Sequence, residues 1–268
     1  KRTDLEYTVK YLELGTENAL AEEKIVTGQT FKSVVTEQAI DIPGYTKQEP
    51  IEQSIEIAVE DNEIIFYYKK IDGLVYTVKY LEQGTEVEIA PEKIVDGNTF
   101  NDVVLETAIE IEGYNGQEPL EQSIVIGLDE NIIKFYYTKR SDLEYVVNYY
   151  EEGTENAIAD SKVVENQTYL ASVTEQAIDI EGYDKVEPTE KTIQIALEGN
   201  EINFYYTKRT DLSYTVNYLE DETNAVLVES KVVTGQTYLQ KVTEQAIDIE
   251  GYEKKEPTEQ TIEINVDG

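Results

Sequence analysis

The chain has 268 residues, with 22 Lys and Arg against 56 Asp and Glu, so its formal net charge is −34. Such an acidic chain is a poor partner for nucleic-acid phosphates and anionic lipids, so we expect neither nucleic-acid binding nor membrane insertion. His and Cys are absent, which removes the usual general base, disulfides and thiolate metal ligands, and we expect no cofactor and no metal site.

One motif recurs four times and organises the chain. It begins at Val35, Val104, Val173 and Val242, and reads VTEQAIDIEGY in the last two copies. The glycines inside the motif are spaced 69 residues apart, at Gly44, Gly113, Gly182 and Gly251. A fixed period of this length indicates one folded unit copied along the chain. We therefore predict repeat 1 over residues 1–70, repeat 2 over 71–139, repeat 3 over 140–208 and repeat 4 over 209–268.

The first two elements of a repeat have the pattern of strands. Apolar and polar residues alternate over residues 5–12 (LEYTVKYL), which predicts a half-buried strand. Residues 24–31 predict a second strand with a tight turn at Gly28. The turn position is Gly97, Asn166 and Gly235 in the later repeats. Asn best tolerates a left-handed backbone among non-glycine residues, so we expect a positive φ there.

The repeated motif itself favours a short helix. Val35, Ala39 and Ile42 are spaced four and three residues apart, which places them on one helical stripe, and Gly44 follows as a stop. The segment is short and rich in β-branched residues, so a strand is the alternative. An exposed connection over residues 45–52, carrying Glu49-Pro50, is expected next.

The repeat is predicted to close with a hairpin. Residues 55–59 and 64–68 both alternate, and Asp61-Asn62 lies between them. Ile64, Phe66 and Tyr68 are unchanged in repeats 2 and 3, whereas Ile65 becomes Lys or Asn, so only the first set should face a core. Strand, strand, helix, strand, strand is the order of a small α+β fold with a helix on a mixed sheet.

The combination of YTVKYLE, a Gly-containing turn, a Gly-Tyr pair and a closing FYYTK resembles the mucin-binding protein (MucBP) repeats of Gram-positive bacterial surface proteins. The resemblance covers essentially the whole chain. It implies a ubiquitin-like β-grasp fold, export and attachment to the cell wall. The expected fold class is therefore α+β, as a tandem array of four β-grasp units.

The connections between repeats are short, at residues 69–75, 138–144 and 207–213, and they lack the composition of a flexible spacer. We expect an elongated, semi-rigid rod. Two basic pairs lie in these connections, Lys139-Arg140 and Lys208-Arg209. They are predicted to form salt bridges between repeats; the alternative is an exposed pair that contributes almost nothing.

The closing strand is missing from one repeat. First strands occur at Tyr7, Tyr76, Tyr145 and Tyr214, whereas closing strands occur only at Phe66, Phe135 and Phe204. Gly268 aligns with Gly199, just before the next closing strand would begin. We predict that repeat 4 lacks a closing strand and that its sheet is incomplete over residues 209–268. The chain also begins within a motif, as a fragment of a longer array would.

The 21 tyrosines are the only plentiful groups with recognition chemistry, because sugars stack on aromatic faces. The first candidates for glycan binding are the outward tyrosines of the closing strands, Tyr67, Tyr136 and Tyr205. The second are those after the repeated glycine, Tyr45, Tyr114, Tyr183 and Tyr252. The alternative is that the first set are good strand formers at exposed positions and the second cap the core.

Together these features predict a non-enzymatic repeat region of a bacterial cell-surface protein that acts as an extended stalk and can itself bind mucin or other host glycoprotein. The alternative is a dedicated adhesin module with one Tyr-lined glycan site per repeat. Carboxylate pairs such as Glu37 with Asp41 lie on charged faces without an apolar pocket, which argues against catalysis. An extracellular location follows from the resemblance alone, and we expect a monomer.

Overall fold

The structure, a computed structural model, describes residues 1–267, and these form strands and turns without any helix. They divide into two units, Lys1–Lys139 and residues 140–267. The first unit contains repeats 1 and 2, and the second contains repeats 3 and 4. Residue 268, whose alignment with Gly199 sets the end of repeat 4, lies outside the described residues.

Repeat 1 contains one mixed sheet and one small antiparallel sheet. Its strands are β1 (Leu5–Glu13), β2 (Lys24–Gln29), β3 (Val34–Gln38), β4 (Tyr45–Lys47), β5 (Glu52–Glu56) and β6 (Glu63–Lys70). The four-stranded sheet has the order β2-β1-β6-β4, and β3 pairs with β5. The first and last strands, β1 and β6, are parallel neighbours at the centre of the larger sheet.

Repeats 2 and 3 have the same topology. The strands of repeat 2 are β7 (Leu74–Glu82), β8 (Glu88–Asn98), β9 (Val103–Thr107), β10 (Tyr114–Gly116), β11 (Glu121–Val125) and β12 (Ile132–Lys139). Those of repeat 3 are β13 (Leu143–Glu151), β14 (Lys162–Gln167), β15 (Ser172–Gln176), β16 (Tyr183–Lys185), β17 (Glu190–Gln194) and β18 (Glu201–Lys208). Their larger sheets run β10-β12-β7-β8 and β14-β13-β18-β16.

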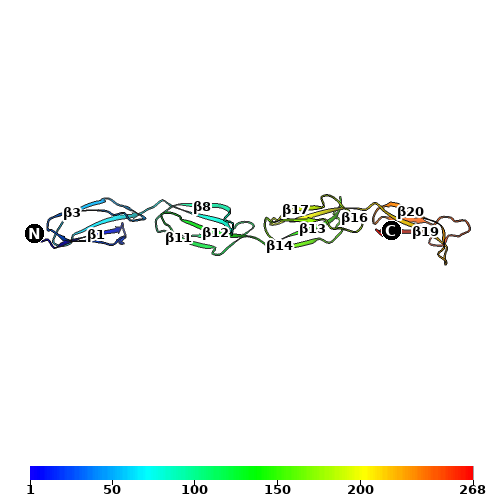
Figure 1. Cartoon of the computed structure of the whole chain (residues 1–268), viewed down its shortest axis with the longest axis horizontal. Coiled ribbons are helices and arrows are strands. Elements are labelled where there is room, and N and C mark those ends of the chain that lie inside the picture. Colours follow the sequence, from blue (N-terminus) through cyan, green and yellow to red (C-terminus); the bar gives the residue numbers. More distant parts are fainter. Residues whose placement is uncertain (268) are drawn as a thin grey trace. The chain divides into compact units, whose positions relative to one another are not determined.

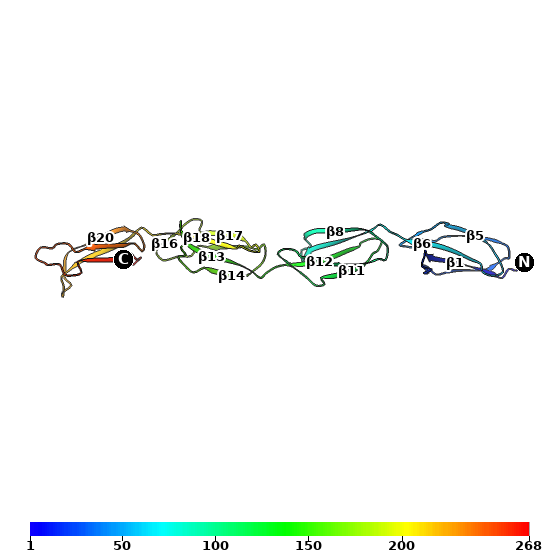
Figure 2. The same cartoon turned by 180° about the vertical axis from the view of Figure 1, so that it is seen from behind.

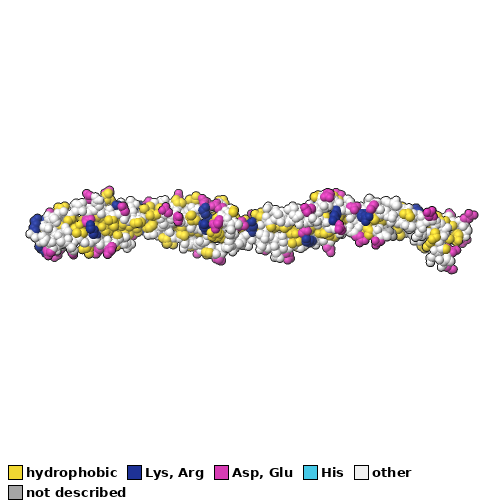
Figure 3. Space-filling model, viewed as in Figure 1, with side chains coloured by type: hydrophobic (Ala, Val, Ile, Leu, Met, Phe, Trp, Pro, Cys, Tyr) yellow, Lys and Arg dark blue, Asp and Glu magenta, His cyan; other side chains and the backbone are white. Residues whose placement is uncertain are grey.

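The core of each repeat lies between the two sheets. In repeat 1 the buried side chains alternate along β1 and β6, and Val35 of β3 and Ile55 of β5 pack against them. β3 lies above β1 in Figure 1, and β5 lies above β1 in Figure 2, so both strands lie to the same side of β1. Ile64, Phe66 and Tyr68 are buried, as the sequence predicts. Acidic side chains are spread over the visible face of both units (Figure 3).

The α+β prediction is wrong, and the repeats are all-β. The segment expected as a helix forms β3, which pairs with β5 from Val34 to Gln38. Its side chains alternate in exposure, and Thr36 Oγ1 hydrogen-bonds across the pair to Ser54 Oγ at 2.7 Å. Short helices are marginal on their own, whereas β-branched residues fit a half-buried pleated surface. This finding also overturns the β-grasp fold implied by the MucBP resemblance.

The predicted closing hairpin is also wrong, because β5 and β6 belong to different sheets. The connection between them crosses the core at the buried Ile57 and is held by the Asn62 side chain. Asn62 Oδ1 accepts from the backbone N of Ala58 at 2.7 Å, and Nδ2 donates to Glu6 O at 3.0 Å. Asn131 and Asn200 make the same contacts in repeats 2 and 3.

The first two strands and the positive φ near the end of the second are confirmed, but the predicted tight turn is not, because the four residues lie inside strands, as Gly28 does in β2, where the pairing with β1 shifts register. β1 and β2 occupy the expected positions. The φ angle is positive at all four predicted positions: 75° at Gly28, 76° at Gly97, 58° at Asn166 and 70° at Gly235. Alternation of side chains and a positive φ at a single residue are local properties, which explains why the sequence pattern locates them.

Repeat 4 has only four strands over residues 209–267: β19 (Leu212–Leu219), β20 (Val226–Gln236), β21 (Lys241–Gln245) and β22 (Glu259–Glu263). They form two separate antiparallel pairs, β19-β20 and β21-β22. No strand in this range lies parallel to β19, although β1, β7 and β13 each have such a neighbour.

Candidate functional site

The outward tyrosines lie on the closing strands, next to the first strand of the same repeat. Tyr67 on β6 is 39% exposed, Tyr205 on β18 is 37% exposed and Tyr136 on β12 is half-buried. Their neighbours on the first strand differ, since Leu12 lies beside Tyr67 and Tyr150 lies beside Tyr205. The first-strand residue beside the outward tyrosine is therefore aliphatic in repeat 1 and aromatic in repeat 3.

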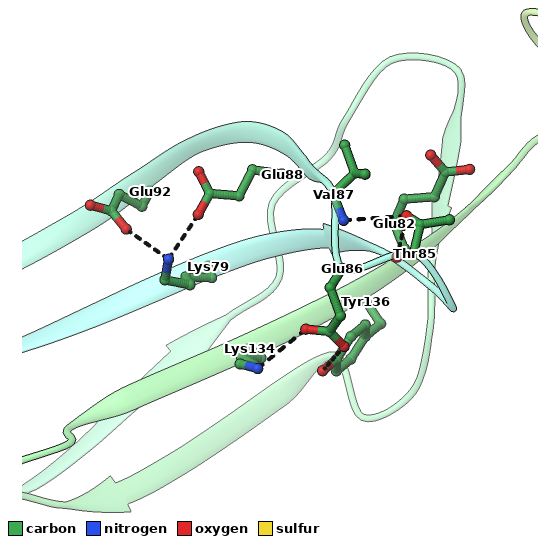
Figure 4. A network of polar contacts seen from close by, with 9 residues as sticks. All are labelled: Lys79, Glu82, Thr85, Glu86, Val87, Glu88, Glu92, Lys134 and Tyr136. Carbon is green, nitrogen blue, oxygen red and sulfur yellow. Dashed lines mark hydrogen bonds and ion pairs between the residues drawn. The ribbon is translucent and has the colours of Figure 1, made fainter.

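In repeat 2 the outward tyrosine belongs to a polar network (Figure 4). Tyr136 donates its phenol proton to Glu86 Oε1 at 3.0 Å, and Lys134 lies 3.2 Å from Glu86 Oε2. The bonds from Tyr136 and Lys134 lower the pKa of Glu86, and Glu86 in turn raises the pKa of Tyr136. Nearby, Lys79 bridges Glu88 and Glu92.

The network around Tyr136 is specific to repeat 2. Position 134 is Lys in repeat 2 but Ile65 in repeat 1 and Asn203 in repeat 3. In repeat 3 the Tyr205 ring instead lies 6.2 Å from Tyr150 and 5.5 Å from Lys191 Nζ. The three outward tyrosines thus share a position on the strand but not a set of polar partners.

Two tyrosines of the second set, Tyr45 and Tyr183, lie where consecutive repeats meet within a unit. Tyr45 packs edge-on against Phe100 of repeat 2, with ring centres 5.8 Å apart, and Tyr183 packs in the same way against Tyr238 of repeat 4 at 5.5 Å. Tyr252 in repeat 4 is 49% exposed. Tyr114 packs against the core of repeat 2.

The aromatic ring at each of these junctions covers the repeated glycine. A Cβ on Gly44 would lie 2.1 Å from Phe100 Cε1, and a Cβ on Gly182 would lie 2.4 Å from Tyr238 Cδ1. The backbone adds two hydrogen bonds at each place, because Ile71 N donates to Gly44 O and Phe100 N donates to Ile71 O. In the second unit, Arg209 N donates to Gly182 O and Tyr238 N donates to Arg209 O. We call this arrangement the glycine–aromatic junction.

The basic pairs in the connections bind carboxylates close by. Lys139 lies 3.2 Å from Glu82, and Lys208 lies 3.4 Å from Glu151. Arg140 and Arg209 each form a two-pronged pair with the aspartate two residues on, which is an exposed local contact. In the junction between repeats 3 and 4, Arg209 takes part through its backbone.

A cluster of Tyr, Glu and Lys occurs in all four repeats and was not predicted. In repeat 1, Tyr7 donates to Glu37 Oε1 at 2.5 Å and Lys24 donates to the same carboxylate at 2.7 Å. The same two contacts hold for Tyr76, Glu106 and Lys93, for Tyr145, Glu175 and Lys162, and for Tyr214, Glu244 and Lys231. Tyr, Lys and Glu recur at these positions every 69 residues. This recurrence is the sequence signal from which the cluster could have been predicted.

This Tyr–Glu–Lys cluster ties together three strands of a repeat. Burial raises the pKa of the Glu37 carboxyl, but the hydrogen bonds from Lys24 and Tyr7 outweigh burial, so its pKa lies below the ordinary value. Burial and the bond to Glu37 raise the pKa of Tyr7 to about 12. An ionised carboxylate that accepts two strong hydrogen bonds is a stabilising link, and it is poorly suited to take up a proton.

Glu37 and Asp41, the two carboxylates considered for acid–base chemistry, each form an ion pair with a different lysine. Glu37 binds Lys24, and Asp41, which is fully exposed, binds Lys47 at 2.8 Å. Within residues 1–267 there is no group of three or more acidic side chains placed to hold a metal ion. The same residues contain no helix long and apolar enough to cross a membrane.

No protein-family model and no curated protein sequence matches the chain. Among solved structures, a type 2 repeat of the mucus binding protein MUB from Lactobacillus reuteri is similar at 14% identity and a TM-score of 0.19, covering 50% of this chain and 98% of the other. A streptococcal ancillary pilin is similar at 12% identity and a TM-score of 0.20, covering 71% of this chain and 80% of the other. Such low TM-scores carry no argument about fold or function, so the MucBP resemblance stays a prediction.

Proposed function

We propose that the chain is a non-enzymatic stalk region of a bacterial cell-surface protein, in which repeats act as coupled spacers. The observation that supports this proposal is the glycine–aromatic junction, which occurs with the same contacts between repeats 1 and 2 and between repeats 3 and 4. A spacer needs neighbouring repeats that hold a defined orientation, and a packed ring with two backbone hydrogen bonds supplies such a restraint. The bacterial surface location rests on the motif resemblance.

Small-angle X-ray scattering of residues 1–268 tests the stalk. Four repeats in line, each about 28 Å across, predict a maximum dimension of at least about 110 Å, against about 50 Å for one compact body of this length. A maximum dimension near the smaller value would contradict the proposal.

A second candidate function is binding of mucin or other glycoprotein through the outward tyrosines. The supporting observation is the exposure of Tyr67 and Tyr205 on the closing strands. The differences around Tyr136 and Tyr205 favour the spacer over one shared glycan site per repeat.

The glycan function is tested by binding the chain to immobilised mucin before and after enzymatic removal of its glycans, at two salt concentrations. Binding through tyrosine faces predicts glycan-dependent, saturable binding that is lost in the Tyr67→Ala, Tyr205→Ala double variant. The matched control is the Val34→Ala, Val103→Ala double variant, which removes two exposed apolar side chains elsewhere. Equal binding by both double variants would exclude the tyrosines as the site.

A further inference from the structure

Repeat 2 carries an Asn-Gly pair on a short edge strand. Asn115 and Gly116 lie in β10, which stands at the end of its sheet and pairs with β12. Both residues are exposed. At this position the other repeats have Thr46-Lys47, Asp184-Lys185 and Glu253-Lys254. The sequence contains no other Asn that is followed by Gly.

The side-chain amide of Asn115 is not held in place. Within residues 1–267 it has no hydrogen-bond partner. Asn131 in the same repeat is held tightly by comparison, because its Oδ1 accepts from Gly127 N at 2.7 Å and its Nδ2 donates to Val75 O at 3.1 Å. The Asn115 amide can therefore turn back towards the backbone, whereas the Asn131 amide cannot.

The register of β10 also leaves the Gly116 N–H outside the ladder. Gln117 N donates to Tyr136 O at 2.8 Å, so these two residues are a hydrogen-bonded pair of the antiparallel ladder. Such pairs alternate with pairs that are not hydrogen-bonded, and Gly116 opposite Tyr137 is the next pair. Since β10 is an edge strand, the Gly116 N–H points to the side that carries no strand.

Repeat 2 lacks an ion pair that ties down the corresponding segment in the other repeats. There a lysine at the position of Gly116 binds an aspartate that precedes the repeated glycine, and the pairs are Lys47 with Asp41 at 2.8 Å, Lys185 with Asp179 at 2.8 Å and Lys254 with Asp248 at 2.9 Å. Gly116 has no side chain to form this pair. The three residues of β10 should therefore open locally more readily than their counterparts.

We propose that Asn115 is a site of spontaneous deamidation, a covalent modification confined to repeat 2. The Gly116 nitrogen loses its proton to water and attacks Asn115 Cγ. A C–N bond forms, the bond between Cγ and Nδ2 breaks, and ammonia leaves from a five-membered succinimide. Glycine favours this attack because no Cβ obstructs its nitrogen.

Water then opens the succinimide ring in one of two ways. Cleavage of the bond between Cγ and the Gly116 nitrogen gives aspartate at position 115. Cleavage of the bond between the Asn115 backbone carbonyl carbon and the same nitrogen gives isoaspartate, in which the chain runs through the former side chain. Water is the only co-reactant, and nothing is oxidised or reduced.

The two products should differ in their effect on β10. Aspartate keeps the backbone unchanged, and Asp184 already occupies this position in β16, opposite Thr207. Isoaspartate adds one methylene to the backbone, which disturbs the register opposite Thr138. Both products add a negative charge to repeat 2, but only isoaspartate should loosen the strand.

The direct test is incubation of the full chain at neutral and at mildly alkaline pH, followed by peptide mapping with mass spectrometry. We expect a gain of one mass unit in the peptide that contains Asn115 and none in the peptide that contains Asn131. The rate should rise with pH, because the attack needs a deprotonated nitrogen. It should lie within about tenfold of the rate in a synthetic peptide of residues 112–118, since a short edge strand opens at little cost.

Two glycine variants test the role of Gly116. Gly116→Lys gives repeat 2 the residue of the other repeats and should slow deamidation of Asn115 about tenfold or more, because the new side chain obstructs the nitrogen. Its Cβ would lie 2.9 Å from Leu120 Cδ2, the end of a flexible side chain, so the variant should fold. Gly127→Ala is the matched control, since Gly127 is the other glycine of repeat 2 without a positive φ, and it should leave the rate unchanged.

Ion-exchange chromatography separates the products, and hydrogen exchange compares them. The Gln117 amide should exchange faster in the isoaspartate form, whereas the aspartate form and the Asn115→Asp variant should match the unmodified chain. Exchange over β9 and β11 should be the same in all forms. Equal exchange of the Gln117 amide in both products would contradict the predicted loosening of β10.

Two results would overturn the proposed site. The first is conversion of Asn115 in the folded chain that is no faster than conversion of Asn131, while Asn115 does convert in the chain unfolded in urea. The second is an equal rate of conversion in the Gly116→Lys variant and the unaltered chain.

Discussion

Repeats 3 and 4 share the residues of their first strands that face inward, yet their cores differ over the described residues. Nine residues form the buried core of repeat 3, among them Val147 and Tyr149. Only Leu212, Tyr214 and Ile264 are buried in the core of repeat 4, and the counterparts of Val147 and Tyr149 are half-buried. The first strands of the two repeats carry the same apolar pattern.

This comparison shows that the burial of a strand depends on its neighbour as well as on its own pattern. The closing strand contributes Ile202, Phe204 and Tyr206 to the core of repeat 3, and each fully buried side chain of this kind stabilises by roughly 1.5–3 kcal/mol. The same strand also covers Val147 and Tyr149 from the side. Matched substitutions in the two repeats of residues 1–268 therefore measure how much a closing strand adds to the burial energy of the first strand.

The largest expected effect is at the central tyrosine of the first strand. Tyr149 packs against Phe204 and Tyr206, so Tyr149→Ala should destabilise repeat 3 by about 3–5 kcal/mol, as for other buried aromatics. Tyr218→Ala should cost roughly 1–2 kcal/mol in repeat 4, because less area is buried there. Hydrogen exchange of each repeat measures both values, and equal losses would show that the closing strand does not determine the burial energy.

The second effect concerns the glycine–aromatic junction. Gly182→Ala should destabilise the junction by about 3 kcal/mol, because φ is positive and the new Cβ meets Tyr238. Gly251 has the same backbone conformation with nothing within 4 Å, so Gly251→Ala should cost only about 1–2 kcal/mol. The measurement is the exchange rate of the Arg209 and Tyr238 amides. If both variants change it alike, the ring contact contributes nothing.

The third effect is pH-dependent and concerns the Tyr–Glu–Lys cluster. Burial raises the pKa of Glu175, but bonds from Lys162 and Tyr145 bring it below the ordinary value. A lowered folded-state pKa means that the stabilisation is present above the unfolded value of about 4.3 and is lost as pH falls through the folded value. Glu175→Gln should therefore cost about 1–2 kcal/mol at pH 7 and progressively less towards pH 3.

Urea unfolding at several pH values measures this difference between the Glu175→Gln variant and the unaltered chain. Glu244→Gln is the matched change in repeat 4, where the carboxylate is more exposed, and it should have a smaller effect. A cost of Glu175→Gln that does not change with pH would show that the charge of the carboxylate is irrelevant.

The smallest effect is expected at the basic residues of the connections. Arg209 pairs with Asp211 on the surface, and exposed pairs of this kind contribute little. Arg209→Ala should leave the unfolding midpoint unchanged, since the junction uses only the backbone of this residue. A clear loss of stability would support the salt bridge between repeats that the sequence suggested.

Much of each repeat could be predicted from its sequence because the signals are local. Alternation located β1 and the buried face of β6, and the exchange of Gly for Asn located a left-handed residue at Asn166, although that residue lies inside β14 and not in the predicted turn. The helix prediction was wrong because the helical spacing of Val35, Ala39 and Ile42 is a coincidence. Val35 lies in β3, which ends at Gln38, whereas Ala39 and Ile42 lie in the irregular segment that follows.

The pairing of strands could not be read from the pattern, because alternation fixes a face and not a partner. The segment between β5 and β6 has the composition of a hairpin turn, yet Asn62 uses its side chain to hold a crossing between two sheets. The contacts of Tyr7 with Glu37 and of Phe100 with Gly44 join residues distant in sequence, so only their recurrence at the repeat period could have indicated them.

The parallel pairing of the first and last strands has a mechanical consequence. Tension applied through the two ends of a repeat pulls β1 from its N-terminal end and β6 from its C-terminal end. In parallel strands these ends point in opposite directions, so the load acts along the strands as shear. The ladder from Thr8–Glu63 to Glu13–Tyr68 must then break together instead of opening one hydrogen bond at a time. Repeats 1 to 3 have this geometry, so a pulling force on either end of such a repeat loads all the hydrogen bonds of the parallel pair at once.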